Sequence, residues 1–301
     1  MRQQSELEVG GKRLQVSNLD KVLYPKARFT KGDVIDYYIH VSSVLLPHLK
    51  NRPLTLKRYP NGVEAEFFYE KKCPSHRPPW VNTAKVWSEG NQADIYFCMA
   101  NDLPTLVWAA NLADLELHTS LARYPKIKSP TMIVFDLDPG APANIIQCCQ
   151  VGIWLRKILD ETGLECFPKT SGSKGLQIYV PLNTPANYEN TKSFAKEIAA
   201  RLERDHPEMV LSKMAKILRG GKVFVDWSQN DDHKTTICAY SLRAKENPTV
   251  STPVTWKEVE AALKKRDAEL LNFKSDDVLK RVEGLGDIFE PVLKTKQKLK
   301  S

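Results

Sequence analysis

The chain has 301 residues, and 44 Lys and Arg against 36 Asp and Glu give it a formal net charge of +8 at pH 7. A hydrophobic fraction of 42% excludes an intrinsically disordered chain and is enough to build a substantial core. No run of about 18 apolar residues and no apolar leader is present, so we expect a cytoplasmic protein without a membrane span. The positive charge allows a polyanion partner but does not require one.

Short apolar or alternating runs, bounded by Pro, Gly and Asn, predict strands. These strands are expected over residues 13–16, 52–59, 66–70, 94–99, 114–118, 131–138, 164–170, 176–181, 222–227 and 235–240. Helical periodicity and N-cap signals predict the helices. They are expected over residues 34–46, 103–112, 143–160, around 194–202, and from 256 onward.

Strands and helices do not alternate regularly, which predicts an α/β fold of the mixed α+β kind. We expect a single catalytic domain over residues 1–301, because no linker-like stretch divides the chain. Within it we distinguish an N-terminal part (about 1–120), a catalytic core (about 121–250) and a helical C-terminal part (251–301).

The six cysteines include no C-x-x-C pair. Cys73 and His76 form a C-x-x-H pair, but no second pair stands near it to complete a zinc site. The sequence therefore predicts reduced thiols in a cytosolic protein rather than disulfides or a bound metal.

Asp136 and Asp138 end the strongest predicted strand, just before Pro139 and Gly140. Residues two apart on a strand project from the same face, so both carboxylates point to one place. Carboxylates that close repel each other unless a cation neutralises them. The pair therefore indicates a metal site, although a strand-end pair that caps the following turn would have the same spacing.

The segment from Thr170 to Gly175 (TSGSKG) joins two predicted strands. Its glycines allow backbone N–H groups to turn toward an anion, and Ser171, Ser173 and Lys174 add donors. The spacing is not that of a Walker P-loop, and an ordinary hairpin loop is the alternative.

Asp226 stands alone in the apolar segment FVDW. An unpaired buried charge is costly, so it needs a partner. One interpretation pairs it with Arg219, Lys222 or Arg243. The other makes it a third ligand beside Asp136 and Asp138, because three carboxylates holding two divalent ions are the equipment of in-line phosphoryl transfer.

Basic and aromatic residues elsewhere fit phosphate and base contacts. They are Lys57, Arg58, Phe67, Phe68, His118 and Arg243. Each has an ordinary alternative: either phenylalanine can be a core residue, His118 a structural histidine, and Lys21 and Lys31 surface lysines.

Taken together, these motifs resemble the polymerase domain of bacterial and archaeal DNA ligase D, in the archaeo-eukaryotic primase superfamily. The resemblance runs in order through NLDKVLYP, LKRYPNG, LELH, FDLDPG, TSGSKGL, KVFVDWSQN and AYSLRA, and covers most of the chain. It implies a primase-like fold with mixed and antiparallel sheets flanked by helices.

The resemblance also implies roles for individual residues. Asp136, Asp138 and Asp226 match the catalytic aspartates that hold two Mn²⁺ or Mg²⁺ ions. The nucleotide-binding positions are matched by Lys57, His118, Ser171, Lys174, Arg243, Phe67 and Phe68. Lys21 and Lys31 match the site for the DNA 5′-phosphate, while Arg219, Arg58 and Gln177 have active-centre positions of less certain role. Gln177 departs from the family, which commonly has His there, and Gln cannot become cationic.

The resemblance implies template-dependent addition of NTPs or dNTPs, with ribonucleotides preferred, at gaps and broken ends during non-homologous end joining. Expected partners are DNA, a Ku-type end-binding protein and a DNA ligase, with the chain itself a monomer that joins the nucleoid when on DNA. Two rival hypotheses are a D-x-D transferase that uses nucleotide sugars and a non-catalytic module that binds DNA ends. The rivals leave, respectively, the basic residues and the three aspartates unexplained.

Overall fold

The strongest apolar run of the sequence forms β10 (Met132–Pro139), the central strand of a five-stranded sheet. The computed structural model describes residues 4–299, which divide into two compact units. Unit 2 contains residues 126–234, 251–273 and the segment from 287 onward.

The sheet of unit 2 has the order β11-β12-β10-β14-β13. The neighbours of β10 are β12 (Leu176–Pro181), β11 (Phe167–Thr170), β14 (Val223–Asp226) and β13 (Val210–Leu211). All pairs are antiparallel except β13 with β14, which are parallel, so the sheet is mixed.

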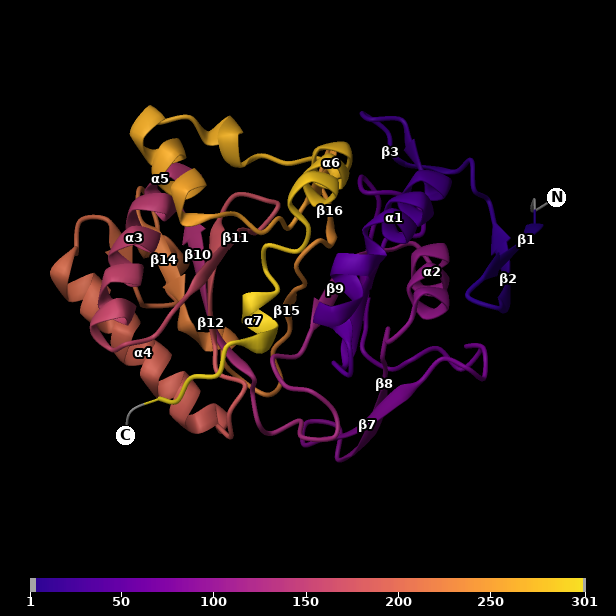
Figure 1. The fold of residues 1–301 in the computed structure, drawn as a ribbon, viewed down its shortest axis with the longest axis horizontal. Coiled ribbons are helices and arrows are strands. Elements are labelled where there is room, and N and C mark those ends of the chain that lie inside the picture. Colours follow the sequence, from indigo (N-terminus) through magenta and orange to yellow (C-terminus); the bar gives the residue numbers. More distant parts are fainter. Residues whose placement is uncertain (1–3, 300–301) are drawn as a thin grey trace. The chain divides into compact units, whose positions relative to one another are not determined.

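Helices α3 (Ile145–Glu161) and α4 (Tyr188–Asp205) cover one face of this sheet (Figure 1). Ile133, Phe135 and Leu137 of β10 are fully buried against them. The remaining elements are α5 (Trp256–Lys265), which packs on α3, α7 (Pro291–Lys294), and the 3-10 helices η1 (Lys216–Leu218), η2 (Trp227–Gln229) and η3 (Ala268–Leu271). Because successive strand residues alternate between faces, Asp136 and Asp138 project from the other face of β10.

Unit 1 contains the residues up to 125, 235–250 and 274–286. Its six-stranded sheet has the order β15-β9-β5-β8-β7, with β6 paired to β5. These strands are β5 (Leu54–Arg58), β6 (Phe68–Glu70), β7 (Thr83–Ser88), β8 (Ala93–Cys98), β9 (Asp114–Thr119) and β15 (Thr236–Ile237). Three antiparallel pairs complete it: β1 (Gln4–Val9) with β2 (Lys12–Ser17), β3 (Val22–Tyr24) with β4 (Phe29–Thr30), and β16 (Leu242–Ala244) with β17 (Pro248–Val250).

The helices of unit 1 are α1 (Lys31–Leu49), α2 (Leu103–Asn111) and α6 (Ser275–Leu285). Thr30 is the N-cap of α1: its Oγ1 accepts from the Asp33 N–H at 3.2 Å, and Asp33 Oδ2 accepts from the Thr30 N–H at 2.7 Å. Such a reciprocal cap contributes about 1 kcal/mol and fixes where the helix begins. The start of α1 is therefore set by its own sequence.

The predicted mixed α+β fold is confirmed, and each predicted helix and strand has a counterpart. The strand expected over 235–240 is shorter than predicted and covers only Thr236–Ile237; Tyr240, with a φ of 65°, is not extended. No helix among residues 4–299 is long and apolar enough to cross a membrane. The expectation of one catalytic domain stays a prediction, since compactness of the two units does not test it.

The prediction that all thiols are reduced is wrong for one pair. Cys73 and Cys98 form a disulfide within unit 1, with Cα atoms 4.9 Å apart. The Cys73 N–H donates to the Tyr96 carbonyl at 2.7 Å, which holds this loop beside the end of β8. A sulfur bonded to Cys98 is no thiolate ligand, so the C-x-x-H pair with His76 is not a metal site. The four other cysteines are buried free thiols.

Candidate functional site

Asp136 and Asp138 lie on the face of β10 that α3 and α4 do not cover. The residues between and before them, Leu137 and Phe135, are fully buried in the helix-covered core. The period of two therefore turns both carboxylates to the same side, as the sequence predicted.

Strand register brings Asp226 to the same face. In the antiparallel pair of β10 and β14, Asp226 lies directly opposite Asp136. Directly opposed residues project from one face of a sheet, with Cβ atoms about 5 Å apart. On the other side of β10, Gln177 of β12 is the residue opposite Asp136. The three aspartates, here called the aspartate face, come from two adjacent strands.

This arrangement makes the ionisation of Asp136 less favourable. Burial and the nearby Asp138 carboxylate, with a further contribution from Asp226, raise the pKa of Asp136 to about 7. A hydrogen bond from Gln177 and the charge of Lys169 act in the opposite direction. Since repulsion between the carboxylates disfavours ionisation, a bound cation would relieve it.

The carboxylate of Asp226 is held in place by its own turn. Oδ1 accepts from the Ser228 N–H at 2.9 Å and from the Ser228 hydroxyl at 2.6 Å, and Oδ2 accepts from Gln229 Nε2 at 3.0 Å. Asp226 thereby caps η2 while it faces Asp136 across the strands. Its partners differ from the arginines and lysine that the sequence offered as alternatives.

The loop from Ser171 to Gly175 is compact and packs against the end of β10. Ser171 Oγ accepts from the N–H groups of Ser173 and Gly175 at 3.2 and 3.1 Å, and Lys174 Nζ donates to the Pro139 carbonyl at 3.2 Å. A Cβ on Gly175 would lie 2.3 Å from the Leu137 carbonyl oxygen, so only glycine fits there. The loop thus places Lys174 at the end of the strand that carries Asp138.

Arg219 lies on the face of the sheet that carries the aspartates. Its guanidinium stacks on the Phe224 ring at 3.9 Å, and Phe224 is the residue opposite Asp138. Gly140 allows this approach, because a Cβ there would lie 1.9 Å from the Arg219 carbonyl oxygen. The predicted active-centre position of Arg219 is consistent with this contact.

Lys169 is a residue of this face that the sequence did not indicate. It lies opposite Gln177 in the register of β11 and β12, and its side chain is fully buried. Lys169, Gln177, Asp136 and Asp226 therefore form one row across four strands, here called the cross-strand row. A buried lysine charge without hydrogen-bond partners would destabilise the fold, so the contacts that Lys169 makes within this row matter for stability.

Unit 1 contains a second charged group, organised by Glu116 of β9. The Glu116 carboxylate accepts hydrogen bonds from Lys57 Nζ at 3.1 Å and from the Ala244 N–H at 3.0 Å. It also lies 3.0 Å from His118 Nε2 and 3.3 Å from Arg243 Nε. The structure thus brings together three predicted nucleotide-binding residues around a carboxylate that was not predicted. We call these four side chains the Glu116 cluster.

The Glu116 cluster has more positive than negative charge. Burial opposes ionisation of Glu116, but the hydrogen bond from His118 and the charges of Arg243 and Lys57 outweigh it and hold its pKa well below the usual range. Burial lowers the pKa of His118, despite its contact with Glu116. With His118 neutral, Lys57 and Arg243 leave the cluster one net positive charge.

The two phenylalanines are exposed and face different groups. Phe67 is 48% exposed, and Lys57 Nζ lies 4.4 Å from its ring centroid. Phe68 is 44% exposed, and the Arg58 guanidinium carbon lies 5.1 Å from its ring centroid. Arg58 also forms an ion pair with Glu70, with Nη1 and Oε2 2.7 Å apart. Neither ring is a core residue, and Phe67 contacts Lys57 of the Glu116 cluster.

Lys21 and Lys31 lie side by side at the start of α1. The Lys31 N–H donates to the Lys21 carbonyl at 2.9 Å, and Lys21 Nζ donates to Asn61 Oδ1 at 2.9 Å. Burial lowers the pKa of Lys31 to about 8, with further contributions from Lys21 and Arg58. Two lysines at a helix N-terminus, where the helix dipole is positive, favour a nearby anion.

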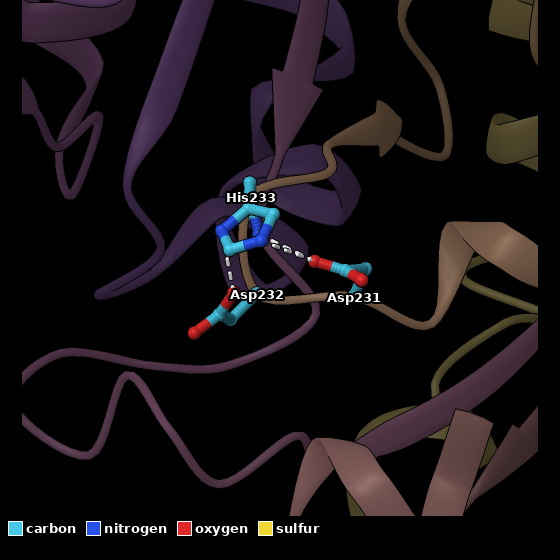
Figure 2. A group of neighbouring side chains, drawn as sticks. All are labelled: Asp231, Asp232 and His233. Carbon is cyan, nitrogen blue, oxygen red and sulfur yellow. Dashed lines mark hydrogen bonds and ion pairs between the residues drawn. The ribbon is translucent and has the colours of Figure 1, made fainter. Parts of the chain in front are cut away.

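A further group of potential ligands lies at Asp231, Asp232 and His233 (Figure 2). Each of these three side chains offers one ligand atom, and the three atoms lie within 4.8 Å of one another. Among residues 4–299, such a group is found here. His233 Nε2 lies 3.1 Å from Asp231 and Nδ1 lies 2.7 Å from Asp232. Asp231 also pairs with Lys192 and Asp232 with Lys128. Because lysines already neutralise its carboxylates, this loop has less need of a metal ion than the aspartate face, where the carboxylates repel one another.

A sheet face with three carboxylates, together with clusters of cationic side chains, is typical of a metal-dependent enzyme that acts on phosphates. Residues 30–289 match the model of the LigD primase-polymerase domain. The chain belongs to this family, which makes it a nucleotidyltransferase of the primase-polymerase class.

Relatives and a solved structure agree with this assignment. The multifunctional non-homologous end joining protein LigD of Mycolicibacterium smegmatis is 40% identical over 282 residues, 93% of this chain and 36% of that protein. The bifunctional LigD of Bacillus subtilis is 37% identical over 83% of this chain and 40% of its own length. The chain thus spans about two fifths or less of these relatives. The polymerase domain of Mycobacterium tuberculosis ligase D in complex with DNA matches with a TM-score of 0.87 and 40% identity, over 95% of this chain and 99% of that one.

Proposed function

We propose that this chain adds nucleotides, directed by a template, at gaps and broken ends of DNA during non-homologous end joining. The observation that carries the proposal is the aspartate face: three carboxylates on one side of β10 and β14, with the pKa of Asp136 raised by burial and by Asp138. The family adds the reaction class, and the M. tuberculosis neighbour was solved with DNA.

The aspartate face fits a pair of divalent cations, Mn²⁺ or Mg²⁺. Asp136, Asp138 and Asp226 offer only oxygen ligands, which these hard ions prefer, and their mutual repulsion is relieved by positive charge. When bound, such ions stabilise the charge on the transferring phosphoryl oxygens and lower the pKa of the attacking 3′-hydroxyl. The chain's own part is to fix the carboxylates: β-strand register places Asp136 and Asp226, and Ser228 and Gln229 orient the latter.

The cationic residues are proposed to bind the triphosphate and sugar of the incoming nucleotide. Lys57 and Arg243 supply charge, while Glu116 limits their side-chain freedom before any ligand arrives. Such preorganisation lowers the cost of binding. His118 is proposed to approach the ribose, Phe67 and Phe68 to stack on bases, and Ser171 and Lys174 to add phosphate contacts.

Lys21 and Lys31 are proposed to bind the 5′-phosphate at the far side of a gap. Their position at the N-terminus of α1 combines two charges with the helix dipole. This gives the basic residues a substrate in DNA, where the nucleotide-sugar hypothesis gives them none. A Ku-type protein and a DNA ligase are the proposed partners, with the chain acting as a monomer among them on the nucleoid.

Primer extension on a gapped duplex tests the proposal. Wild-type protein is compared with Asp136→Ala, with NTPs or dNTPs and with or without Mn²⁺. We expect Mn²⁺-dependent incorporation, faster with NTPs, that the substitution abolishes. A protein that binds the duplex but incorporates nothing would be an end-binding module instead. Equal rates with NTPs and dNTPs would remove the sugar preference alone.

A further inference from the structure

The cross-strand row contains a chain of hydrogen bonds whose direction is fixed by chemistry. Lys169 Nζ donates to Gln177 Oε1 at 2.6 Å and to Ser251 Oγ at 2.5 Å. The Ser251 hydroxyl in turn donates to the Thr170 carbonyl at 3.1 Å. A lysine ammonium has donors and no acceptor, so the Gln177 atom that it meets is the carbonyl oxygen.

That contact determines which end of the Gln177 amide faces Asp136. The Tyr179 hydroxyl also donates to Gln177 Oε1, at 3.4 Å, so two donors hold the oxygen on one side. The NH₂ group of Gln177 is then the end that hydrogen-bonds to the Asp136 carboxylate. A reversed amide would place NH₂ against NH₃⁺ and a carbonyl oxygen against a carboxylate. The reversal would also lose the charge-assisted hydrogen bond from Lys169, so Lys169 opposes it.

We propose that Lys169 is a positioning residue, which acts through Gln177 to orient the Asp136 carboxylate toward a divalent cation. Lys169 is fully buried, so its charge is not available to a substrate in solution. Its effect reaches Asp136 through the amide, in the way that outer-shell groups orient metal ligands. The inference rests on the proposed function only in taking the aspartate face as the cation site.

The sign of one substitution separates orientation from simple charge. Lys169→Met keeps an unbranched side chain that is one atom shorter, but removes the hydrogen bonds to Gln177 and Ser251 and the positive charge. If Lys169 acted only by repelling a cation, its loss would tighten Mn²⁺ binding. If it orients the row, its loss weakens Mn²⁺ binding, by roughly tenfold or more as for other outer-shell changes.

The experiment measures the affinity for Mn²⁺ alone, from the free-ion signal in electron paramagnetic resonance titrations of the intact chain. The variants are Lys169→Met, Gln177→Met and the double substitution, with Asp136→Asn to show that the ion measured is the one at the aspartate face. Lys222→Met is the matched control, because it removes a lysine of unit 2 whose ammonium donates to the Pro207 carbonyl, outside the row. We expect both single variants to weaken binding, the double variant to be no weaker than either, and the control to match the wild type.

Unchanged or tighter binding in Lys169→Met, or independent losses that multiply in the double variant, would overturn the proposal. So would Mn²⁺ binding that Asp136→Asn leaves intact. Nucleotide incorporation by the wild type is measured separately: its absence would count against the proposed function, while the Mn²⁺ affinities would still decide the role of Lys169.

A second measurement needs no change at Lys169, should that variant not fold. In the ¹⁵N-glutamine-labelled wild-type chain, the Gln177 NH₂ signals are assigned by their loss in Gln177→Met. We expect nuclear Overhauser contacts from these protons to the Asp136 β-protons rather than to the Tyr179 ring. The reverse pattern would show an inverted amide and overturn the proposal.

Discussion

The aspartate face and the Glu116 cluster bury charge in contrasting ways. The aspartate face gathers three carboxylates, and the pKa of Asp136 rises to about 7 because burial and Asp138 disfavour its ionisation. In the Glu116 cluster, one carboxylate has cations around it, and its pKa is held well below the usual range. The carboxylates of the first region therefore repel one another, whereas the second region has one net positive charge. The difference indicates that the aspartate face is suited to bind a cation and the Glu116 cluster an anion.

Removal of Asp138 should break the first half of this comparison most severely. Asp138→Ala removes a proposed metal ligand, so we expect nucleotide incorporation to fall by about 10³-fold or more, since a metal supplies several kcal/mol of transition-state stabilisation. The metal-free protein should nevertheless melt at the same or a higher temperature, because the repulsion with Asp136 is gone. Single-turnover extension and thermal melting in EDTA measure the two effects.

Asp231→Asn is the control, because this carboxylate lies in the loop where lysine already pairs with it. We expect its incorporation rate to remain within about twofold of the wild type, as for substitutions away from a site. A loss as large as that of Asp138→Ala would move the metal site to Asp231, Asp232 and His233.

Removal of the charge on Glu116 should damage the second region through stability. Glu116→Gln leaves Lys57 and Arg243 without their buried counter-charge, so we expect a loss of about 3 kcal/mol in the free energy of unfolding. Urea unfolding at pH 7 measures it. Glu70→Gln serves as the control, because the pair of Glu70 with Arg58 is more exposed and its loss should cost less. Equal losses for the two variants would contradict the central place of Glu116.

The same carboxylate makes a prediction about pH. Its pKa is lower in the folded chain than the ordinary value of about 4.3, so the unfolded chain takes up the proton first as pH falls. The stabilisation is complete above that value and is lost as pH falls toward the folded-state pKa. The difference in unfolding free energy between wild type and Glu116→Gln should be constant from pH 7 to 5 and then shrink by about 1.4 kcal/mol per pH unit. A difference that stays constant at pH 3.5 would sink this assignment.

The smallest effect is expected at the lysine pair. Lys31→Met should weaken binding to a gapped duplex by about tenfold when the gap carries a 5′-phosphate, the value of one charge-assisted hydrogen bond. It should have little effect when the gap carries a 5′-hydroxyl. Because the pKa of Lys31 is lowered to about 8, the wild-type preference for phosphate should itself decline as pH rises through that value. Fluorescence anisotropy with the two duplexes measures both, and equal weakening on both would exclude a phosphate contact.

The parts of the site that the sequence could predict are those set by local periodicity. Asp136 and Asp138 share a face because they are two residues apart on a strand, and Thr30 begins α1 because it caps it. Glu116 could have been found in the same way, since it stands two residues before His118 in β9 and shares its face.

The parts that could not be predicted depend on register between distant strands. Asp226 is 90 positions from Asp136, and only the pairing of β10 with β14 makes them neighbours. Lys169 reads as an exposed strand residue until β11 pairs with β12 and places it opposite Gln177. The Cys73–Cys98 disulfide has a separation of 25 residues that matches no motif, and it forms because a loop returns to the end of β8. Such contacts come from tertiary packing, which one sequence does not display.

The most direct test of the account is the Mn²⁺ dependence of gap filling by wild type and Asp226→Asn. The substitution keeps the size of the side chain and an acceptor for Ser228, but removes one carboxylate from the aspartate face. We predict that the wild-type rate rises with Mn²⁺ and saturates, and that the variant needs far more Mn²⁺ or shows no incorporation at any concentration. A variant with the same Mn²⁺ dependence and the same maximal rate as the wild type would contradict the claim that this face holds the catalytic metal.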